Sequence, residues 1–220
     1  MKKLAPPEYV IFDMDGTLVD NYHVHIDAWL AISTKYGGPT SREAIIADLH
    51  GTNFEICQKY FGPTSKEDAD RIAEEKEAKY RELYAPHIEP VTGLMAFVDH
   101  LKELHVPMAV GTMGTKENAR FVIDALGLQS YLSHWRSAEC VERGKPHPDI
   151  FMECLKPWGT INLGPDRLWV IEDTSSGIAA GKACGATVIG VRTSKTDEEL
   201  RSAGADLTVG NYYELLKMMG

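Results

Sequence analysis

Cysteine, long apolar stretches and positive charge are all scarce in this chain. The four cysteines, Cys57, Cys140, Cys154 and Cys184, show no C-x-x-C spacing, so neither a zinc site nor a dithiol redox motif is indicated. We therefore expect free thiols in a reducing compartment. No run of residues is long enough to cross a membrane, and the basic start of the chain is not followed by the apolar stretch of a signal peptide. These absences predict a cytoplasmic protein.

Positive charge is also outnumbered by negative charge. Lysine and arginine number 23 against 32 aspartates and glutamates, so the net charge is −9 at pH 7. This balance argues against nucleic acid or an anionic membrane as the main partner. An anionic substrate would therefore need a locally positive pocket. The 220 residues, 44% of them hydrophobic, suffice for one large domain or a domain with an insert. We expect a monomer or a weak dimer.

The most informative stretch of the sequence lies near its start. An apolar run over residues 9–12 predicts a buried strand, and it ends in two carboxylates, Asp13 and Asp15. Because side chains at positions i and i+2 of an extended chain point the same way, these two should lie close together. Two such anions repel each other unless a cation or a shared proton intervenes. The pair therefore indicates a site for a hard cation such as Mg²⁺, beside a carboxylate that is free to react.

A helical region follows this strand. Apolar residues recur at helical spacing over residues 25–36, and two Thr-x-x-Glu patterns, from Thr40 and from Thr64, predict helix starts. A stretch with two prolines, residues 86–90, resembles a linker that closes the region. We therefore predict an all-helical insert over residues 21–90.

The remainder of the chain alternates between strand and helix patterns. Short buried strands are predicted at residues 107–111, near residue 135, and at residues 167–171 and 186–191. Alternation at these lengths favours a parallel sheet with helices on both faces. The predicted fold class is α/β. A Rossmann-like, doubly wound core of residues 1–20 and 91–220 is interrupted, just after its first strand, by the helical insert.

Polar side chains stand where these predicted strands end. Ligands of doubly wound sheets bind at the carboxyl ends of the strands. The first strand delivers the Asp13 and Asp15 pair, the second delivers Thr112, and the strand over residues 167–171 delivers Glu172 and Asp173. Lys145 stands just before a predicted helix. These distant segments can converge on one crevice.

The carboxylates of this set suit phosphoryl transfer. Mg²⁺ prefers oxygen ligands, here Asp13, Asp173, Asp15 through its backbone carbonyl, and Glu172 directly or through water. Asp13, which directly ends the strand, suits nucleophilic attack on phosphorus to form an aspartyl-phosphate. Asp15 suits the acid and base roles, because it can protonate the leaving oxygen and then deprotonate the attacking water.

The remaining polar groups can hold the phosphate. Lys145 would offset charge among the carboxylates and bind a phosphate oxygen. Thr112 and nearby backbone N–H groups would donate hydrogen bonds to the same oxygens. The residues after this threonine, Met113 and Gly114, are therefore candidates for substrate contacts. Each signal is weak alone, but their order and their places at strand ends make the set specific.

Four segments together resemble the signature motifs of the haloacid dehalogenase-like hydrolase superfamily. They are residues 13–20, Thr112, residues 144–149 with Lys145, and residues 172–180. The resemblance extends over nearly the whole chain, and the insert is similar to that family's helical C1 cap. It is nearest to the β-phosphoglucomutase-like group and its sugar-phosphate phosphatases. The resemblance implies a Rossmann-like core, Mg²⁺, a nucleophilic first aspartate and an acid/base second aspartate.

The cap residues bear on the substrate. His25 has the spacing of a β-phosphoglucomutase histidine that positions the acid/base residue, and Lys76 resembles a cap lysine near the active site. His25 could instead be an ordinary helix residue, and Lys76 a solvated helix residue. In mutases a lysine and an arginine flank a cap glycine, but here His50 and Phe54 take those places. Losing the guanidinium removes a bidentate phosphate clamp, and this favours hydrolysis.

The prediction is a Mg²⁺-dependent phosphatase of small phosphomonoesters, most consistent with sugar or polyol phosphates. A β-phosphoglucomutase-type phosphomutase is the first alternative. A catalytically idle phosphate-binding protein is the second, and the intact Asp13, Asp15, Lys145 and Asp173 argue against it.

Overall fold

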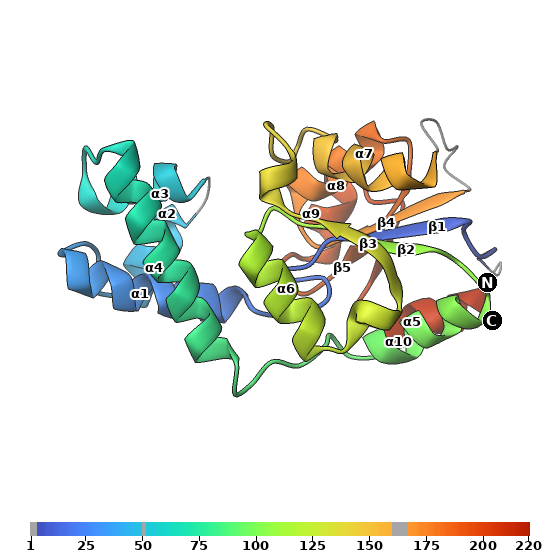
Figure 1. Ribbon diagram of the computed structural model, residues 1–220. Helices are drawn as coiled ribbons and strands as arrows, with labels where there is room; N and C mark the ends of the chain where they lie inside the picture. The colour runs from blue at the N-terminus through green and yellow to red at the C-terminus, as the bar shows by residue number, and fades with distance from the viewer. Residues whose placement is uncertain (1–3, 50–51, 160–166) are drawn as a thin grey trace. The chain divides into compact units, whose positions relative to one another are not determined.

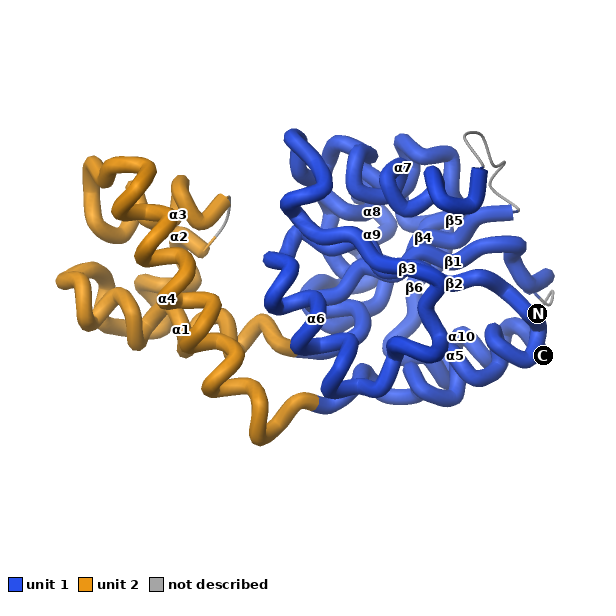
Figure 2. The backbone as a smooth tube through the Cα atoms, viewed as in Figure 1, with its two compact units in different colours: residues 1–20, 89–220 blue, residues 21–88 orange. Residues whose placement is uncertain are grey.

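The computed structural model describes residues 4–49, 52–159 and 167–220 (Figure 1). The chain divides into two compact units (Figure 2). Unit 1 comprises Met1–Asp20 and Glu89–Gly220, and unit 2 comprises Asn21–Ile88.

Unit 1 is built on a parallel sheet. In the described part of the chain it has six strands in the order β3-β2-β1-β4-β5-β6. The strands are β1 Tyr9–Phe12, β2 Met108–Gly111, β3 Leu132–Arg136, β4 Leu168–Glu172, β5 Thr187–Val191 and β6 Leu207–Val209. This strand order is that of a doubly wound sheet, which turns in opposite directions on either side of β1 and β4. The predicted α/β fold is confirmed.

Helices cover both faces of the sheet (Figure 1). They are α5 Leu94–Glu103, α6 Lys116–Ala125, α7 Asp149–Leu155, α8 Ser175–Ala183, α9 Asp197–Ser202 and α10 Tyr212–Met219, with short 3₁₀ turns at Leu128–Ser130, Ala138–Cys140 and Lys156–Trp158. Helix α5 packs against α10, and α7 packs against α8.

The first strand is buried on both faces, as parallel strands are. Ile11 belongs to a core cluster with side chains of α7 and α8, including Phe151 and Ile178. Phe12 points to the other face, where its ring lies 6.1 Å from that of Phe97 on α5 and 6.3 Å from that of Tyr212 on α10. Successive residues of β1 thus anchor both helical layers, which fixes the position of the residue that follows the strand.

Two elements of unit 1, strand β6 and helix α9, were not predicted from the sequence. Strand β6 has only three residues, which is too short for a periodic signal. Helix α9 begins at a capping box, in which Thr196 and Glu199 each accept from the other's backbone N–H. This capping signal was present in the sequence and could have located the helix.

Unit 2 contains helices α1 Tyr22–Tyr36, α2 Arg42–Asp48, α3 Asn53–Phe61 and α4 Lys66–Tyr84. Its own hydrophobic cluster includes Trp29, Ile45, Ile56 and Ile72, one from each helix. No helix in the described ranges is both long enough and apolar enough to cross a membrane.

The predicted helix starts in unit 2 are each wrong by one residue. Ser41 and Ser65, not the threonines before them, are the N-caps, because their side chains accept the backbone N–H groups three residues on. Among the described residues of this unit, Thr52 and Glu55 form a capping box at the start of α3.

We expect Phe97→Ala to lower the free energy of unfolding by about 3–5 kcal/mol, because it empties the space between Phe12 and Tyr212. Urea denaturation would measure the change. Leu104→Ala, at the end of the same helix, is the matched control, because Leu104 is 41% exposed and should change stability by only about 0.5 kcal/mol. Equal losses in the two variants would contradict this packing.

Candidate active site

Acidic residues gather where the sheet changes direction. Strands β1 and β4 are neighbours, and their carboxyl ends carry Asp13 on one side and Glu172 and Asp173 on the other. The backbone N–H of Asp13 donates to the carbonyl of Ile171 at 2.9 Å, so the pairing of the two strands continues up to the first carboxylate. This is the place where doubly wound sheets bind ligands.

Three carboxylates form what we call the acidic cluster: Asp13, Glu172 and Asp173. One oxygen from each lies within 4.8 Å of the others. The three residues are buried, with exposed fractions of 6%, 1% and 2%. Buried like charges at this separation are costly unless positive charge is supplied.

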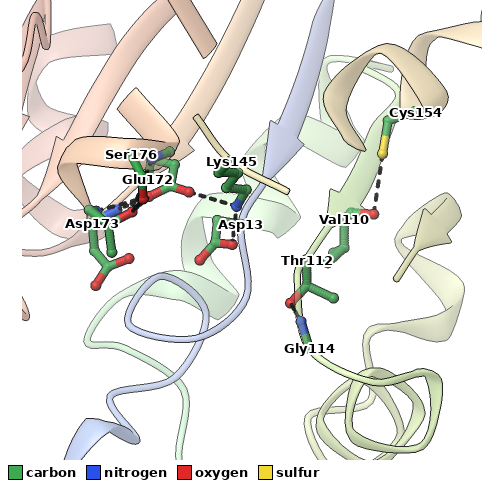
Figure 3. A network of polar contacts seen from close by, with 11 residues as sticks. Asp13, Val110, Thr112, Gly114, Lys145, Cys154, Glu172, Asp173 and Ser176 are labelled. Atoms are coloured by element: carbon green, nitrogen blue, oxygen red, sulfur yellow. Dashed lines mark hydrogen bonds and ion pairs between the residues drawn. The ribbon is translucent and has the colours of Figure 1, made fainter. Parts of the chain in front are cut away.

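Lys145 supplies part of that charge (Figure 3). Its Nζ donates to Asp13 Oδ1 at 2.5 Å and to Glu172 Oε1 at 2.7 Å. Burial lowers the pKa of Lys145, but the charges of Asp13 and Glu172 outweigh burial and hold this pKa above its usual value. The side chain therefore stays an ammonium ion that bridges β1 and β4.

Glu172 is held on both of its oxygens. While Oε1 accepts from Lys145, Oε2 accepts from the backbone N–H groups of Asp173 and Thr174 and from the Thr174 hydroxyl, each at 2.9 Å. A Cβ atom at Gly177 would overlap this carboxylate, so glycine is required there. Glu172 is thereby fixed as the partner of the lysine.

The other two members of the cluster have pKa values above their ordinary range. Burial raises the pKa of Asp13 to about 7; Lys145 opposes the rise, and the charges of Glu172 and Asp15 add to it. Burial, Glu172 and Asp13 together raise the pKa of Asp173 well above its usual value. Its Oδ1 is buried and has no hydrogen-bond partner in the described part of the chain. A divalent cation bound by carboxylate oxygens fits this set.

Asp15 is not one of the three residues of the acidic cluster, and it lies beside the residues that follow β2. A Cβ atom at Gly114 would lie 3.3 Å from Asp15 Oδ2 and 3.2 Å from Thr112 Oγ1. The backbone N–H of Gly114 donates to Thr112 Oγ1 at 2.8 Å. The structure thus brings together three residues that the sequence assigned to one site. Met113 is 38% exposed. Its Cε lies close to Gly144, since a Cβ atom at that glycine would be 3.2 Å away, and Gly144 directly precedes the bridging Lys145.

Gly16 also lies at this site, although no role was assigned to it from the sequence. Its φ is +80°, and a Cβ atom would overlap Asp173 Oδ2. Only glycine lets the loop after β1 approach the second acidic segment this closely. A glycine directly after the two aspartates was the available signal, but its partner is distant in sequence.

Two of the three predicted cap residues lie in unit 2 and meet there. Lys76 Nζ lies 2.9 Å from His25 Nδ1, and it donates to Glu77 Oε1 at 2.9 Å. Lys76 is 3% exposed, so the alternative of a solvated helix residue is wrong. Glu77, which the sequence did not single out, is the carboxylate that balances it. His50 lies outside the described residues.

Comparisons with known proteins give one family. The protein-family model described as haloacid dehalogenase-like hydrolase matches residues 10–191 of this chain. Fructose-1-phosphate phosphatase YqaB of Escherichia coli is 32% identical over 186 residues, covering 83% of this chain and 95% of the relative. Hexitol phosphatase A of the same organism is 32% identical over 184 residues, covering 82% and 81%. The crystal structure of a HAD hydrolase, family IA, variant 3, from Entamoeba histolytica has a TM-score of 0.85 at 28% identity, covering 96% of this chain and 97% of that one.

The raised pKa of Asp13 predicts a pH-dependent stability. In the folded chain this pKa is about 7, against an ordinary value of 3.8, so between these values the folded state holds a proton that the unfolded state has lost. The contribution of Asp13 to the free energy of unfolding therefore falls as pH rises from about 4 to about 7. The Asp13→Asn variant has no titratable carboxyl group at this position, so its stability should not show this pH dependence.

Urea unfolding with a chelator at about pH 5 and about pH 8 tests this prediction. The Asp13→Asn variant should gain stability relative to the unaltered chain at the higher pH. A stability difference that is equal at both pH values would show that Asp13 titrates as an ordinary aspartate.

Proposed function

Because the chain belongs to the haloacid dehalogenase-like hydrolase family, we propose that it is a Mg²⁺-dependent phosphatase of small sugar or polyol phosphates. The observation that carries the proposal is the acidic cluster with Lys145 bridging two of its members at the switch point of the sheet. The relatives named as phosphatases of fructose 1-phosphate and of hexitols support the substrate class.

Mg²⁺ would be held by Asp13 and Asp173, by the backbone carbonyl of Asp15, and by Glu172 directly or through water. The buried, unpartnered Oδ1 of Asp173 supports this assignment. When bound, the ion would neutralise the acidic cluster and the charge of the phosphate.

Asp13 is the proposed nucleophile. Lys145 holds its Oδ1, which leaves Oδ2 to attack phosphorus. A bond forms between Oδ2 and phosphorus, the bond from phosphorus to the sugar oxygen breaks, and an aspartyl-phosphate results. Water then attacks the same phosphorus atom, and the products are inorganic phosphate and the original carboxylate.

Asp15 is the proposed acid and base. It donates its proton to the leaving alkoxide in the first step and takes a proton from the attacking water in the second. Its place beside Gly114 and Thr112 supports a role distinct from that of Asp13. Thr112 Oγ1 accepts from Gly114, so its own hydrogen can be donated to a phosphate oxygen.

We assign this chemistry to the core of residues 1–20 and 91–220, and substrate recognition to the cap of residues 21–90. Cap closure and opening would shield the reaction from bulk water and then release the product. His25, His50 and Lys76 are the proposed cap contacts, with Met113 and Gly114 contributing from the core. The contact between Lys76 and His25 supports a prearranged polar pair.

A phosphomutase of the β-phosphoglucomutase type is the weaker candidate. A mutase must hold a bisphosphate by its far phosphate while the intermediate turns round. Phe54, which takes the place of the mutase arginine, is 40% exposed and cannot make the bidentate contacts of a guanidinium with phosphate.

We expect Asp13→Asn to lower phosphate release more than about 1,000-fold, because the amide cannot form the aspartyl-phosphate. The melting temperature should not fall, since the change removes a charge from a repulsive cluster. Phosphate release from a panel of sugar and polyol phosphates, with Mg²⁺ and with a chelator, would measure this effect. Asp70→Asn, at an exposed ion pair of unit 2, is the matched control and should keep full activity. Retained turnover in the Asp13 variant would refute the nucleophile.

Incubation with β-glucose 1-phosphate separates the phosphatase from the mutase. We expect inorganic phosphate and glucose as products, because Phe54 takes the place of the arginine that holds the second phosphate in mutases. Enzymatic assays for free phosphate and for glucose 6-phosphate would measure both outcomes. Formation of glucose 6-phosphate without release of phosphate would favour the mutase instead.

A further inference from the structure

Three hydroxyl groups from the last part of the chain hold the backbone of the two acidic segments. We call Tyr212, Thr193 and Ser194 the clamp residues. The Tyr212 hydroxyl donates to the carbonyl of Thr17 at 3.0 Å, and the Thr193 hydroxyl donates to the carbonyl of Gly16. The Ser194 hydroxyl donates to the carbonyl of Asp173 at 2.9 Å. The proposed reaction gives none of these three side chains a role.

Tyr212 is the most firmly placed of the clamp residues. It is 0% exposed, its ring lies 5.3 Å from that of Phe97, and its backbone N–H donates to the carbonyl of Thr92 at 3.0 Å. Burial, Asp13 and Asp173 raise its pKa well above the usual value, so the hydroxyl keeps the proton that it donates. Packing fixes the ring, so its hydroxyl holds the carbonyl of Thr17, in the loop after β1, at a fixed position.

The loop after β1 depends on these outside donors for its orientation. Some of its N–H groups bond within the loop, since Gly16 donates to the carbonyl of Val19 at 2.7 Å and Leu18 donates to the carbonyl of Met14 at 2.8 Å. The carbonyls of Gly16 and Thr17 accept from Thr193 and Tyr212 instead. The loop is therefore a closed turn that is held from outside by two hydroxyls and by the backbone N–H of Val91, which donates to the carbonyl of Leu18 at 2.8 Å.

A shift of this loop would act directly on the acidic cluster. Gly16 lies so close to Asp173 that a Cβ atom would overlap its Oδ2. Thr193 and Ser194 are adjacent in the loop after β5, and one holds the segment after β1 while the other holds the segment after β4. The loop after β5 thus bridges the two sides of the cluster.

We propose that Tyr212, Thr193 and Ser194 are positioning residues that keep the two acidic segments at the separation a divalent cation requires. The contacts that carry this role are those with the backbone carbonyls of Gly16, Thr17 and Asp173, and none of the three side chains is given a contact with the substrate. The inference rests on the proposed function in one respect, which is that the cation is Mg²⁺.

Tyr212→Phe is the first test, because it removes the hydroxyl and keeps the ring. Calorimetric titration of the full chain with Mg²⁺ alone should show binding about 10- to 100-fold weaker than that of the unaltered chain. Tyr60→Phe is the matched control. The Tyr60 hydroxyl donates to the carbonyl of Ile45 at 2.6 Å in the core of unit 2, so its loss should lower the urea midpoint by a similar amount without changing Mg²⁺ affinity.

Thr193 offers a second test with a conservative rescue. Thr193→Val removes the donor and should weaken Mg²⁺ binding, whereas Thr193→Ser keeps the donor and should bind as the unaltered chain does. Ser194→Ala should weaken binding as well. This set keeps the inference testable if the tyrosine variant does not fold.

The outcomes separate the two proposals. If the unaltered chain binds Mg²⁺ and releases phosphate while Tyr212→Phe and Thr193→Val bind Mg²⁺ equally well, the positioning role is wrong and the proposed function stands. If the unaltered chain neither binds Mg²⁺ nor releases phosphate from the panel, the proposed function fails and this inference fails with it.

Discussion

Electrostatic repulsion among three buried carboxylates is the constraint on which the rest of this site depends. Asp13, Glu172 and Asp173 bring oxygens within 4.8 Å of one another, where water screens their charges poorly. Lys145 offsets part of the repulsion through its contacts with two of the three. The raised pKa values of Asp13 and Asp173 reflect the repulsion and the burial that remain. Binding a positive charge lowers the electrostatic free energy of such a cluster. An arrangement that destabilises the fold therefore favours the binding of a cation.

The chain holds this unfavourable arrangement with its backbone. Glu172 accepts from two consecutive N–H groups, and Gly16 allows the loop after β1 to press against Asp173. Hydroxyl groups from outside fix the carbonyls of that loop. Such fixed dipoles need little reorganisation when a charged ligand arrives, which is the property that electrostatic stabilisation of a transition state requires.

The sequence predicts what is local and fails where the partners are distant. An apolar run followed by two aspartates is a contiguous signal, and it located β1 correctly, with Asp13 directly after it. The approach of Gly16 to Asp173 joins residues far apart in the chain, and the bond from Tyr212 to Thr17 spans 195 positions, so no spacing rule reaches either of them. Lys76 shows a second limit. A lysine in a highly charged helix is usually solvated, but this one is 3% exposed, and only tertiary packing reveals that Glu77 and His25 surround it.

The strand order also determines when β1 can pair with its neighbours during synthesis on the ribosome. Strand β1 is made first, yet its neighbours in the sheet, β2 and β4, begin only at Met108 and Leu168. An apolar strand with both edges unpaired must therefore wait while most of the chain is still being translated, and such edges invite aggregation. The hydrophobic cluster of unit 2 includes buried residues from Ile26 to Ile72, and local contacts of this kind form early. The helical insert therefore has the contacts to fold during the interval in which the first strand has no partner.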